Sequence, residues 1–219
     1  MVDLIERLRP ADVRENLARV HDHLARAGRD PGDVEILAAV KYLPESQLAA
    51  LFEGGITLVG ENRAQDLAAK APSHPEFTWD FIGTLQSRKV ATVLPYVRYI
   101  HSLASDSALR RLAQYAGSET KVLIEVNVAG DEAKSGIAPA GLGQFIADCP
   151  VEVVGLMTMP PKAERPEANR RHFAALAELA SLHGLRELSM GTSQDYEVAA
   201  SEGATIIRLG STLFRPQGA

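Results

Sequence analysis

The chain has 219 residues, of which 46% are hydrophobic and 23% charged, a composition typical of a soluble globular protein. A formal net charge of -5 gives it no general attraction for nucleic acid or for an anionic membrane, and the charged N-terminal stretch is neither a signal peptide nor a membrane span. The single cysteine, Cys149, cannot form an internal disulfide, and the histidines show no metal-ligand spacing, so we expect a cytoplasmic protein without a metal site.

A helical periodicity follows Asp12, a plausible N-cap, and gives way to apolar β-type runs that alternate with helical stretches. The β-type runs span residues 34–41, 57–62, 77–83, 97–103, 121–128, 151–159, 186–191 and 205–214. Such alternation predicts parallel strands, and eight units without a linker favour closure of the sheet. We therefore expect one α/β domain over residues 1–219, a single (β/α)8 TIM barrel with a leading N-terminal helix. An open doubly wound sheet is the alternative, although no glycine-rich fingerprint follows the first run.

Polar residues gather where the predicted strands end, on the face where barrel enzymes place their chemistry. Lys41 closes the apolar run 34–41, where a hydrated ammonium group is costly and a neutral amine is favoured. A neutral lysine amine attacks carbonyl groups and forms a Schiff base. The alternative is a structural lysine whose ammonium group reaches water at the barrel mouth.

The last two predicted strands end in glycines and hydroxyl side chains, in MGTS before Gln194 and in LGST from Leu209. Free backbone N–H groups in such turns cradle a phosphate, and barrels commonly bind phosphate at these two strand ends; glycine that serves turn geometry alone is the alternative. Arg208 is expected to point into the same mouth, where its acceptor is either a carboxylate such as Glu125 or a heteroaromatic nitrogen. An amine for an aldehyde, a turn for a phosphate and an arginine for a ring nitrogen together describe pyridoxal 5′-phosphate.

These residues stand in stretches that resemble the pyridoxal-phosphate homeostasis proteins, relatives of the N-terminal barrel of alanine racemase. The matching stretches, in order, are AAVKYLP, FEGGITLVGEN, WDFIGTLQSRK, IHSL, VLIEVNVAGDEAKSGI, GLMTMP, LSMGTSQDYEVAASEGAT and IRLGSTLF. Together they cover nearly the whole chain. The sequence departs from the family's usual residues at Val40, Arg63 and Thr192, which leaves the shape of the pocket rim open.

The resemblance implies that Lys41 holds pyridoxal 5′-phosphate as an internal aldimine. Asn62 would lie beside the ring, and Arg208 would face the pyridine nitrogen and keep it unprotonated. The phosphate would be held by Ser193, Gly210 and Ser211, with Ser189 nearby.

A racemase needs a base on each face of its substrate, and alanine racemase takes the second base from a separate β-domain that this chain does not show. No tyrosine falls at a predicted strand end facing the cofactor, and Tyr42 is expected to point away from Lys41. We therefore expect a monomeric, non-catalytic carrier that serves homeostasis of the cofactor and could supply pyridoxal-phosphate-dependent apoenzymes. The alternatives are a weak racemase-like enzyme acting on amino acids and a Schiff-base aldolase that uses Lys41 without a cofactor.

Overall fold

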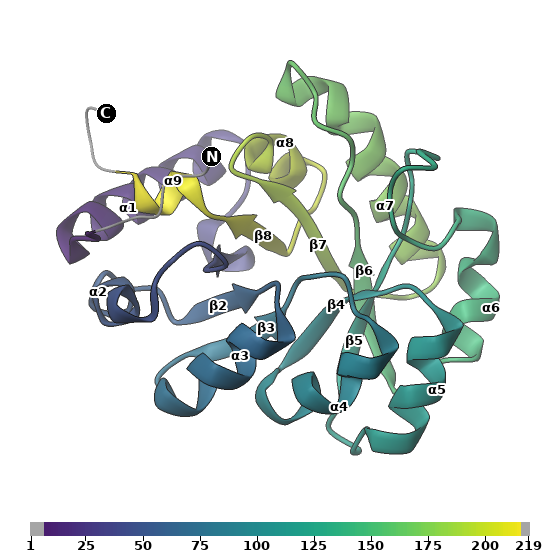
Figure 1. Cartoon of the computed structure of the whole chain (residues 1–219). Helices are drawn as coiled ribbons and strands as arrows, with labels where there is room; N and C mark the ends of the chain where they lie inside the picture. Colours follow the sequence, from purple (N-terminus) through teal and green to yellow (C-terminus); the bar gives the residue numbers. More distant parts are fainter. Residues whose placement is uncertain (1–6, 216–219) are drawn as a thin grey trace.

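The structure, a computed structural model that describes residues 7–215, is a closed barrel of parallel strands wrapped by helices (Figure 1). The strands pair in sequence order and β8 pairs with β1, which confirms the predicted (β/α)8 barrel. Because the sheet closes on itself, the open doubly wound alternative is wrong. The strands are β1 Glu35–Ala39, β2 Leu58–Glu61, β3 Thr78–Phe81, β4 Tyr99–Leu103, β5 Lys121–Glu125, β6 Glu152–Met157, β7 Glu187–Thr192 and β8 Ile206–Leu209.

The helices lie outside the barrel, and the first of them packs beside the last (Figure 1). They are α1 Pro10–Arg26, α2 Leu48–Glu53, α3 Ala64–Lys70, α4 Val90–Val93, α5 Asp106–Tyr115, α6 Leu142–Ala147, α7 Arg170–Leu182, α8 Tyr196–Ser201 and α9 Ser211–Phe214. The side-chain amide of Asn16 in α1 donates to the carbonyl oxygen of Leu213 at 2.9 Å, which joins the two ends of the described chain. No helix within residues 7–215 has both the length and the apolar character that crossing a bilayer requires.

The apolar residues of the strands divide between two compartments. Leu37, Leu58 and Ile206 form a small buried cluster inside the barrel, whereas Ala38 and Ile207 belong to the larger apolar layer between the strands and the helices. Consecutive residues of a strand face opposite sides, so a strand that is buried on both faces is apolar throughout. This arrangement explains why the sequence shows continuous apolar runs rather than alternating ones.

Most of the predicted strands are longer than the observed ones: the fifth ends at Glu125 instead of residue 128, and the sixth at Met157 instead of residue 159. Two further boundary errors concern the first and eighth strands. The first strand ends at Ala39, and the chain then turns, with the N–H of Leu43 donating to the carbonyl oxygen of Val40 at 3.0 Å. The eighth strand ends at Leu209 instead of continuing to residue 214, because the chain folds into α9 after Gly210. Both errors fall where a strand enters a tight turn at the barrel mouth.

The start of the first helix is also corrected. α1 begins at Pro10, whose fixed backbone angle suits the first helical position, and Arg9 occupies the N-cap. Asp12 lies in the first turn, where its carboxylate binds the guanidinium of Arg9 at 2.7 Å. Asp12 therefore complements the helix dipole and does not cap the helix.

Candidate functional site

Lys41 lies in the turn that follows β1, at the mouth of the barrel, and is exposed. The predicted burial of Lys41 is wrong, because the chain leaves the strand at Ala39 and only Val40 remains buried. The Nζ atom lies 4.9 Å from the ring centroid of Tyr42, a cation–π contact. The expectation that Tyr42 points away is wrong as well, since both side chains line one cavity.

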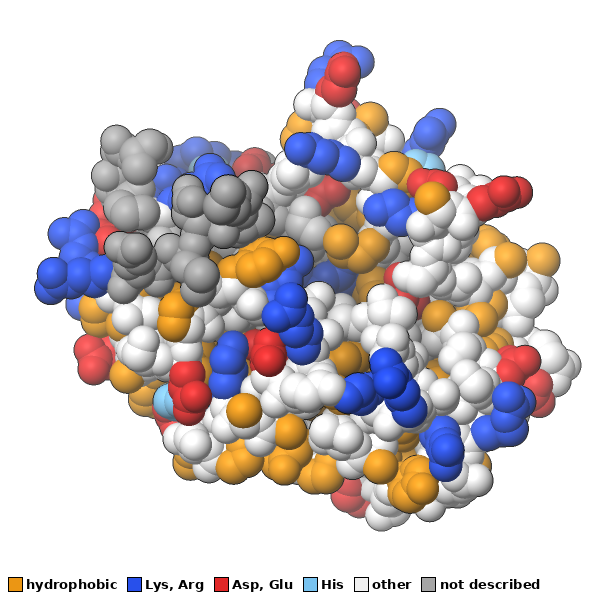
Figure 2. Space-filling model, viewed as in Figure 1, with side chains coloured by type: hydrophobic (Ala, Val, Ile, Leu, Met, Phe, Trp, Pro, Cys, Tyr) orange, Lys and Arg blue, Asp and Glu red, His pale blue; other side chains and the backbone are white. Residues whose placement is uncertain are grey.

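This cavity has a volume of about 430 Å³, within the range of small-molecule sites, and lies over the ends of β1, β2 and β3. Figure 2 shows Lys and Arg side chains around the hollow at the middle of the barrel. The buried Oδ1 of Asn62 has no hydrogen-bond partner among the described residues, a state that costs free energy unless a donor reaches it. The wall is therefore suited to a polar, anionic ligand. Its lining includes Lys41, Tyr42, Asn62, Arg63, Thr84 and Lys89.

A buried ion pair lies directly behind the Lys41 turn. Nζ of Lys70 in α3 lies 2.5 Å from Oε1 of Glu61, whose side chain is fully buried. The same ammonium group donates to the carbonyl oxygens of Val40 at 3.4 Å and Leu43 at 3.3 Å, on either side of Lys41. Lys70 therefore fixes the turn that carries the amine. Lys70 was not predicted from the sequence, although a buried carboxylate such as Glu61 indicates a cationic partner.

Two neighbours hold the backbone of Asn62. Its N–H donates to Oε2 of Glu61 at 2.9 Å. Gly83, two residues after β3, packs so closely that a Cβ atom on it would lie 2.0 Å from the carbonyl oxygen of Asn62. The buried pair and this glycine contact thus join Asn62 to the Lys41 turn.

The turns that follow β7 and β8 converge on one oxygen atom. The backbone N–H groups of Gly210 and Thr212 both donate to Oγ of Ser193, each at 3.3 Å. Two backbone N–H groups that converge on one point can donate hydrogen bonds to a phosphate oxygen. Ser211 lies between them and is exposed. The structure thus brings Ser193, Gly210 and Ser211 together, and we call these residues with Thr212 the anion turn.

The chain around Ser193 is held by its neighbours. Gly191 has a φ of 89°, and a Cβ atom on it would lie 2.6 Å from Cβ of Ala199, so this position requires glycine. The carboxylate of Asp195 accepts the N–H of Thr192 at 2.8 Å and the side-chain amide of Asn169 at 2.8 Å. Ser193 is therefore built into a fixed loop.

The anion turn and Lys41 lie on neighbouring strand ends. β1 and β8 are paired, with Ala38 opposite Leu209, and a Cβ atom on Gly210 would lie 3.8 Å from the carbonyl oxygen of Ala39. Lys41 follows two residues later. The residues of the anion turn do not line the cavity over β1 to β3, whereas Lys41 does. Lys41 therefore lies between that cavity and the anion turn.

Arg208 is buried in the barrel below the anion turn. Nη1 donates to the carbonyl oxygen of Ser189 at 2.8 Å and to its Oγ at 2.5 Å, and Nη2 donates to the carbonyl oxygen of Thr158 and to Sδ of Met159, both at 2.9 Å. None of its hydrogen bonds to the described residues uses Nε. Burial lowers the pKa of Arg208 to about 10, so the guanidinium remains charged at neutral pH.

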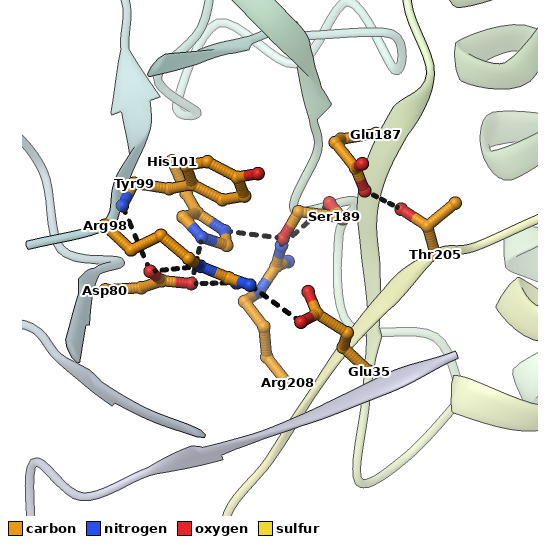
Figure 3. A network of polar contacts seen from close by, with 9 residues as sticks. All are labelled: Glu35, Asp80, Arg98, Tyr99, His101, Glu187, Ser189, Thr205 and Arg208. Carbon is orange, nitrogen blue, oxygen red and sulfur yellow. Dashed lines mark hydrogen bonds and ion pairs between the residues drawn. The ribbon is translucent and has the colours of Figure 1, made fainter. Parts of the chain in front are cut away.

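Two residues singled out from the sequence have different surroundings from those expected. Glu125, the alternative acceptor for Arg208, accepts a hydrogen bond from Ser135 at 2.6 Å and none from Arg208, and burial raises the pKa of its carboxyl. Ser189 is fully buried, and its hydroxyl contacts Arg208 and Nδ1 of His101 (Figure 3). Ser189 therefore belongs to the barrel interior and not to the anion turn.

The chain is similar to proteins of known family. Residues 9–217 match the family described as alanine racemase, N-terminal domain. The chain is also 38% identical to the pyridoxal phosphate homeostasis protein of Aquifex aeolicus (strain VF5), over 213 residues that cover 90% of this chain and 93% of that relative. The chain belongs to this family of pyridoxal phosphate homeostasis proteins, which confirms the resemblance.

Solved structures agree with this assignment. A protein of unknown function from Bifidobacterium adolescentis superposes with a TM-score of 0.85 at 30% identity and covers 97% of this chain and 100% of its own. PipY of Synechococcus elongatus PCC7942, solved with PLP bound, superposes with a TM-score of 0.79 at 31% identity and covers 93% of this chain and 100% of its own. The fold and the chain length of these proteins therefore correspond to those described above.

Proposed function

We propose that the protein binds pyridoxal 5′-phosphate at the barrel mouth, attached to Lys41, and serves homeostasis of this cofactor. The observation that carries the proposal is the position of Lys41 one strand away from two N–H groups that converge on Ser193. The amine would hold the aldehyde carbon and the anion turn the phosphate. The relatives named for this role and the PLP-bound PipY structure support the same ligand.

The residues present fit the cofactor at two further points. The unpartnered Oδ1 of Asn62 offers an acceptor beside Lys41. Nε of Arg208 is left for the pyridine nitrogen, since Nη1 and Nη2 are used by Ser189, Thr158 and Met159. When bound, the group supplies an electrophilic aldehyde carbon on an electron-withdrawing ring. A guanidinium that faces the ring nitrogen keeps protons off that nitrogen, which weakens the electron withdrawal.

We further propose carriage without significant turnover, by a monomer in the cytoplasm that could supply pyridoxal-phosphate-dependent apoenzymes. An exposed Lys41 beside an open cavity favours exchange of the cofactor with the surroundings. A single, half-buried cysteine, whose pKa burial raises, suits a reducing compartment.

A weak racemase-like enzyme is the second candidate, and the position of Tyr42 favours it. The phenol lies against Lys41 in the same cavity and could move a proton at a bound amino acid. The carrier proposal gives this phenol no role.

The test is titration of the purified protein with pyridoxal 5′-phosphate, followed by visible absorbance, borohydride reduction and peptide mass spectrometry. We expect saturable binding and a reduced adduct on the peptide that contains Lys41. Lys41→Ala should lose the adduct, whereas Lys89→Ala, which changes another lysine of the same cavity, should keep it. An adduct on Lys89 in the wild type, or none at all, would refute the proposal.

A second measurement separates the carrier from the enzyme. The loaded protein is incubated with L-alanine or D-alanine, and the optical purity of the amino acid is followed. A carrier leaves it unchanged. Sustained racemisation that disappears in Tyr42→Phe would establish the enzyme instead.

A further inference from the structure

A continuous chain of buried hydrogen bonds lies behind Arg208 and crosses the barrel interior (Figure 3). Oγ of Ser189 contacts Nη1 of Arg208 at 2.5 Å and Nδ1 of His101 at 2.8 Å. Nε2 of His101 contacts Oδ2 of Asp80 at 3.0 Å. Asp80, His101 and Ser189 are each 0% exposed and Arg208 is 6% exposed, so water does not compete for these bonds.

The far end of this chain is anchored at the opposite rim of the barrel, where the strands begin. Asp80 accepts hydrogen bonds from Nη2 of Arg98 at 2.8 Å and from the N–H of Tyr99 at 3.1 Å. Arg98 in turn binds the carboxylate of Glu35, the first residue of β1, at 2.7 Å. The chain of hydrogen bonds therefore connects the rim where the strands begin, which holds no residue proposed to bind the cofactor, to the guanidinium of Arg208 beneath the anion turn.

Charges fix the direction of every bond. Burial favours the uncharged form of Asp80, but hydrogen bonds from His101 and Arg98 outweigh it and hold the pKa of Asp80 below its usual range. Burial lowers the pKa of His101, so the imidazole carries one proton. A carboxylate only accepts, so that proton lies on Nε2 and Nδ1 is an acceptor. The Ser189 hydroxyl then donates to Nδ1 and is left to accept from Arg208.

This arrangement restricts which edge of the guanidinium can meet a ligand. Nη1 is held by both oxygens of Ser189 and Nη2 by Thr158 and Met159. Reversing the His101 tautomer would place two donors, His101 and Arg208, on the Ser189 oxygen and leave the serine proton without its acceptor. His101 and Arg208 would then compete for one oxygen, which weakens one of the four hydrogen bonds that orient the guanidinium.

We propose that Asp80, His101 and Ser189 are positioning residues, which set the tautomer of His101 and thereby hold Arg208 against the ring nitrogen of the bound cofactor. The inference rests on the proposed function, because it assigns Nε of Arg208 to pyridoxal 5′-phosphate. It adds that the electronic state of the bound ring depends on Asp80, a residue that does not touch the ring.

The first arm of the test uses the cofactor-free protein and long-range ¹⁵N–¹H NMR of the His101 ring. We expect the Nε2-protonated tautomer in the wild type. Asp80→Asn can donate to Nε2 through its amide and should convert His101 to the Nδ1-protonated tautomer. A wild-type His101 that carries its proton on Nδ1, or on both nitrogens, would overturn the inference.

The second arm uses the protein loaded with pyridoxal 5′-phosphate. We expect Asp80→Asn and Ser189→Ala to shift the absorbance maximum of the bound cofactor and to weaken its binding on the order of tenfold. Glu35→Gln, which alters the half-exposed far end of the same chain, is the matched control and should leave the spectrum unchanged. Thermal melting of each cofactor-free variant reports whether it is folded, and Ser189→Ala alone decides if Asp80→Asn does not fold.

Two failures are distinguishable. A wild type that binds no pyridoxal 5′-phosphate would refute the proposed function. If the wild type binds the cofactor but the spectra of Ser189→Ala and Asp80→Asn are identical to that of Glu35→Gln, the positioning role is overturned. The buried hydrogen bonds are then a structural feature only.

Discussion

Removal of the Lys70 ammonium tests whether the buried pair with Glu61 holds the Lys41 turn. In Lys70→Met the aliphatic stem remains, but Glu61 keeps a charge at 0% exposure with no cation beside it. Breaking a buried pair by removing one partner costs about 3–5 kcal/mol, because the remaining charge is unpaired. The domain's total stability is of the order of 5–15 kcal/mol, so this loss is a large share of it.

The expected loss can be converted into a melting temperature. For a domain of this size 1 kcal/mol corresponds to roughly 2–4 °C, so Lys70→Met should melt about 6–20 °C below the wild type. Urea unfolding followed through the fluorescence of Trp79, the only tryptophan, gives the free energy directly. Adding Glu61→Gln removes the unpaired charge while keeping an acceptor for the N–H of Asn62, so the double variant should be more stable than Lys70→Met alone.

Lys121→Met is the matched control. Lys121 pairs with Glu152 at 3.4 Å, but their side chains are 39% and 56% exposed, and an exposed pair of this kind is worth about 0–1 kcal/mol. Lys70→Met should also weaken binding of pyridoxal 5′-phosphate, since the carbonyl oxygens of Val40 and Leu43, on both sides of Lys41, lose the hydrogen bonds that Lys70 donates to them. Equal unfolding free energies for Lys70→Met and Lys121→Met would refute the reasoning.

Three further changes follow from the same geometry. Gly83→Ala forces a Cβ atom to within 2.0 Å of the carbonyl oxygen of Asn62 and should cost at least about 1–3 kcal/mol in urea unfolding, whereas Gly117→Ala, where nothing lies within 4 Å, should cost far less. Ser193→Ala removes the hydroxyl oxygen on which the N–H groups of the anion turn converge. It should weaken binding of inorganic phosphate by about tenfold, measured by competition with pyridoxal 5′-phosphate. Unchanged competition would count against phosphate binding at the anion turn. His101 stays neutral when folded but takes up a proton in the unfolded chain below a pH of about 6.5, so stability should fall as the pH drops through that value, and His101→Gln should reduce that slope.

The sequence predicted the fold well because the barrel is built from local signals. Each strand is buried on both faces and so appears as an apolar run, and each helix carries its own periodicity between two runs. The errors at Lys41 and at residues 211–214 have a common cause. A run of residues with β propensity does not reveal where the chain turns, and β1 and β8 both end at turns set by tertiary contacts.

The candidate site was predictable only where its residues occupy strand ends. Lys41, Asn62, Ser193, Gly210 and Ser211 could be found from their place after an apolar run, without knowledge of any contact. The partners that position these residues could not be found in this way. Lys70 lies in a helix. Asp80 is the third residue of β3 and Arg98 precedes β4, 18 residues apart in sequence, so their meeting depends on strand register. The available signal was a single charged residue within an apolar run, such as Asp80 in FTWDFIG, which indicates a buried charge but not its partner.

The two halves of the site differ in how far they are built before a ligand arrives. The anion turn is fixed by Gly191 and Asp195, and Arg208 is held by four hydrogen bonds, so neither needs to be ordered by the cofactor. Lys41 is exposed, and among the described residues its amine makes a cation–π contact with Tyr42 and no hydrogen bond. Preorganised groups give affinity at low entropic cost, whereas an exposed amine without hydrogen bonds must be ordered when it forms its bond. It follows that the affinity should reside mainly in the fixed half and the covalent bond in the exposed half, which is the division that a carrier requires if it is to hold the cofactor and also release it.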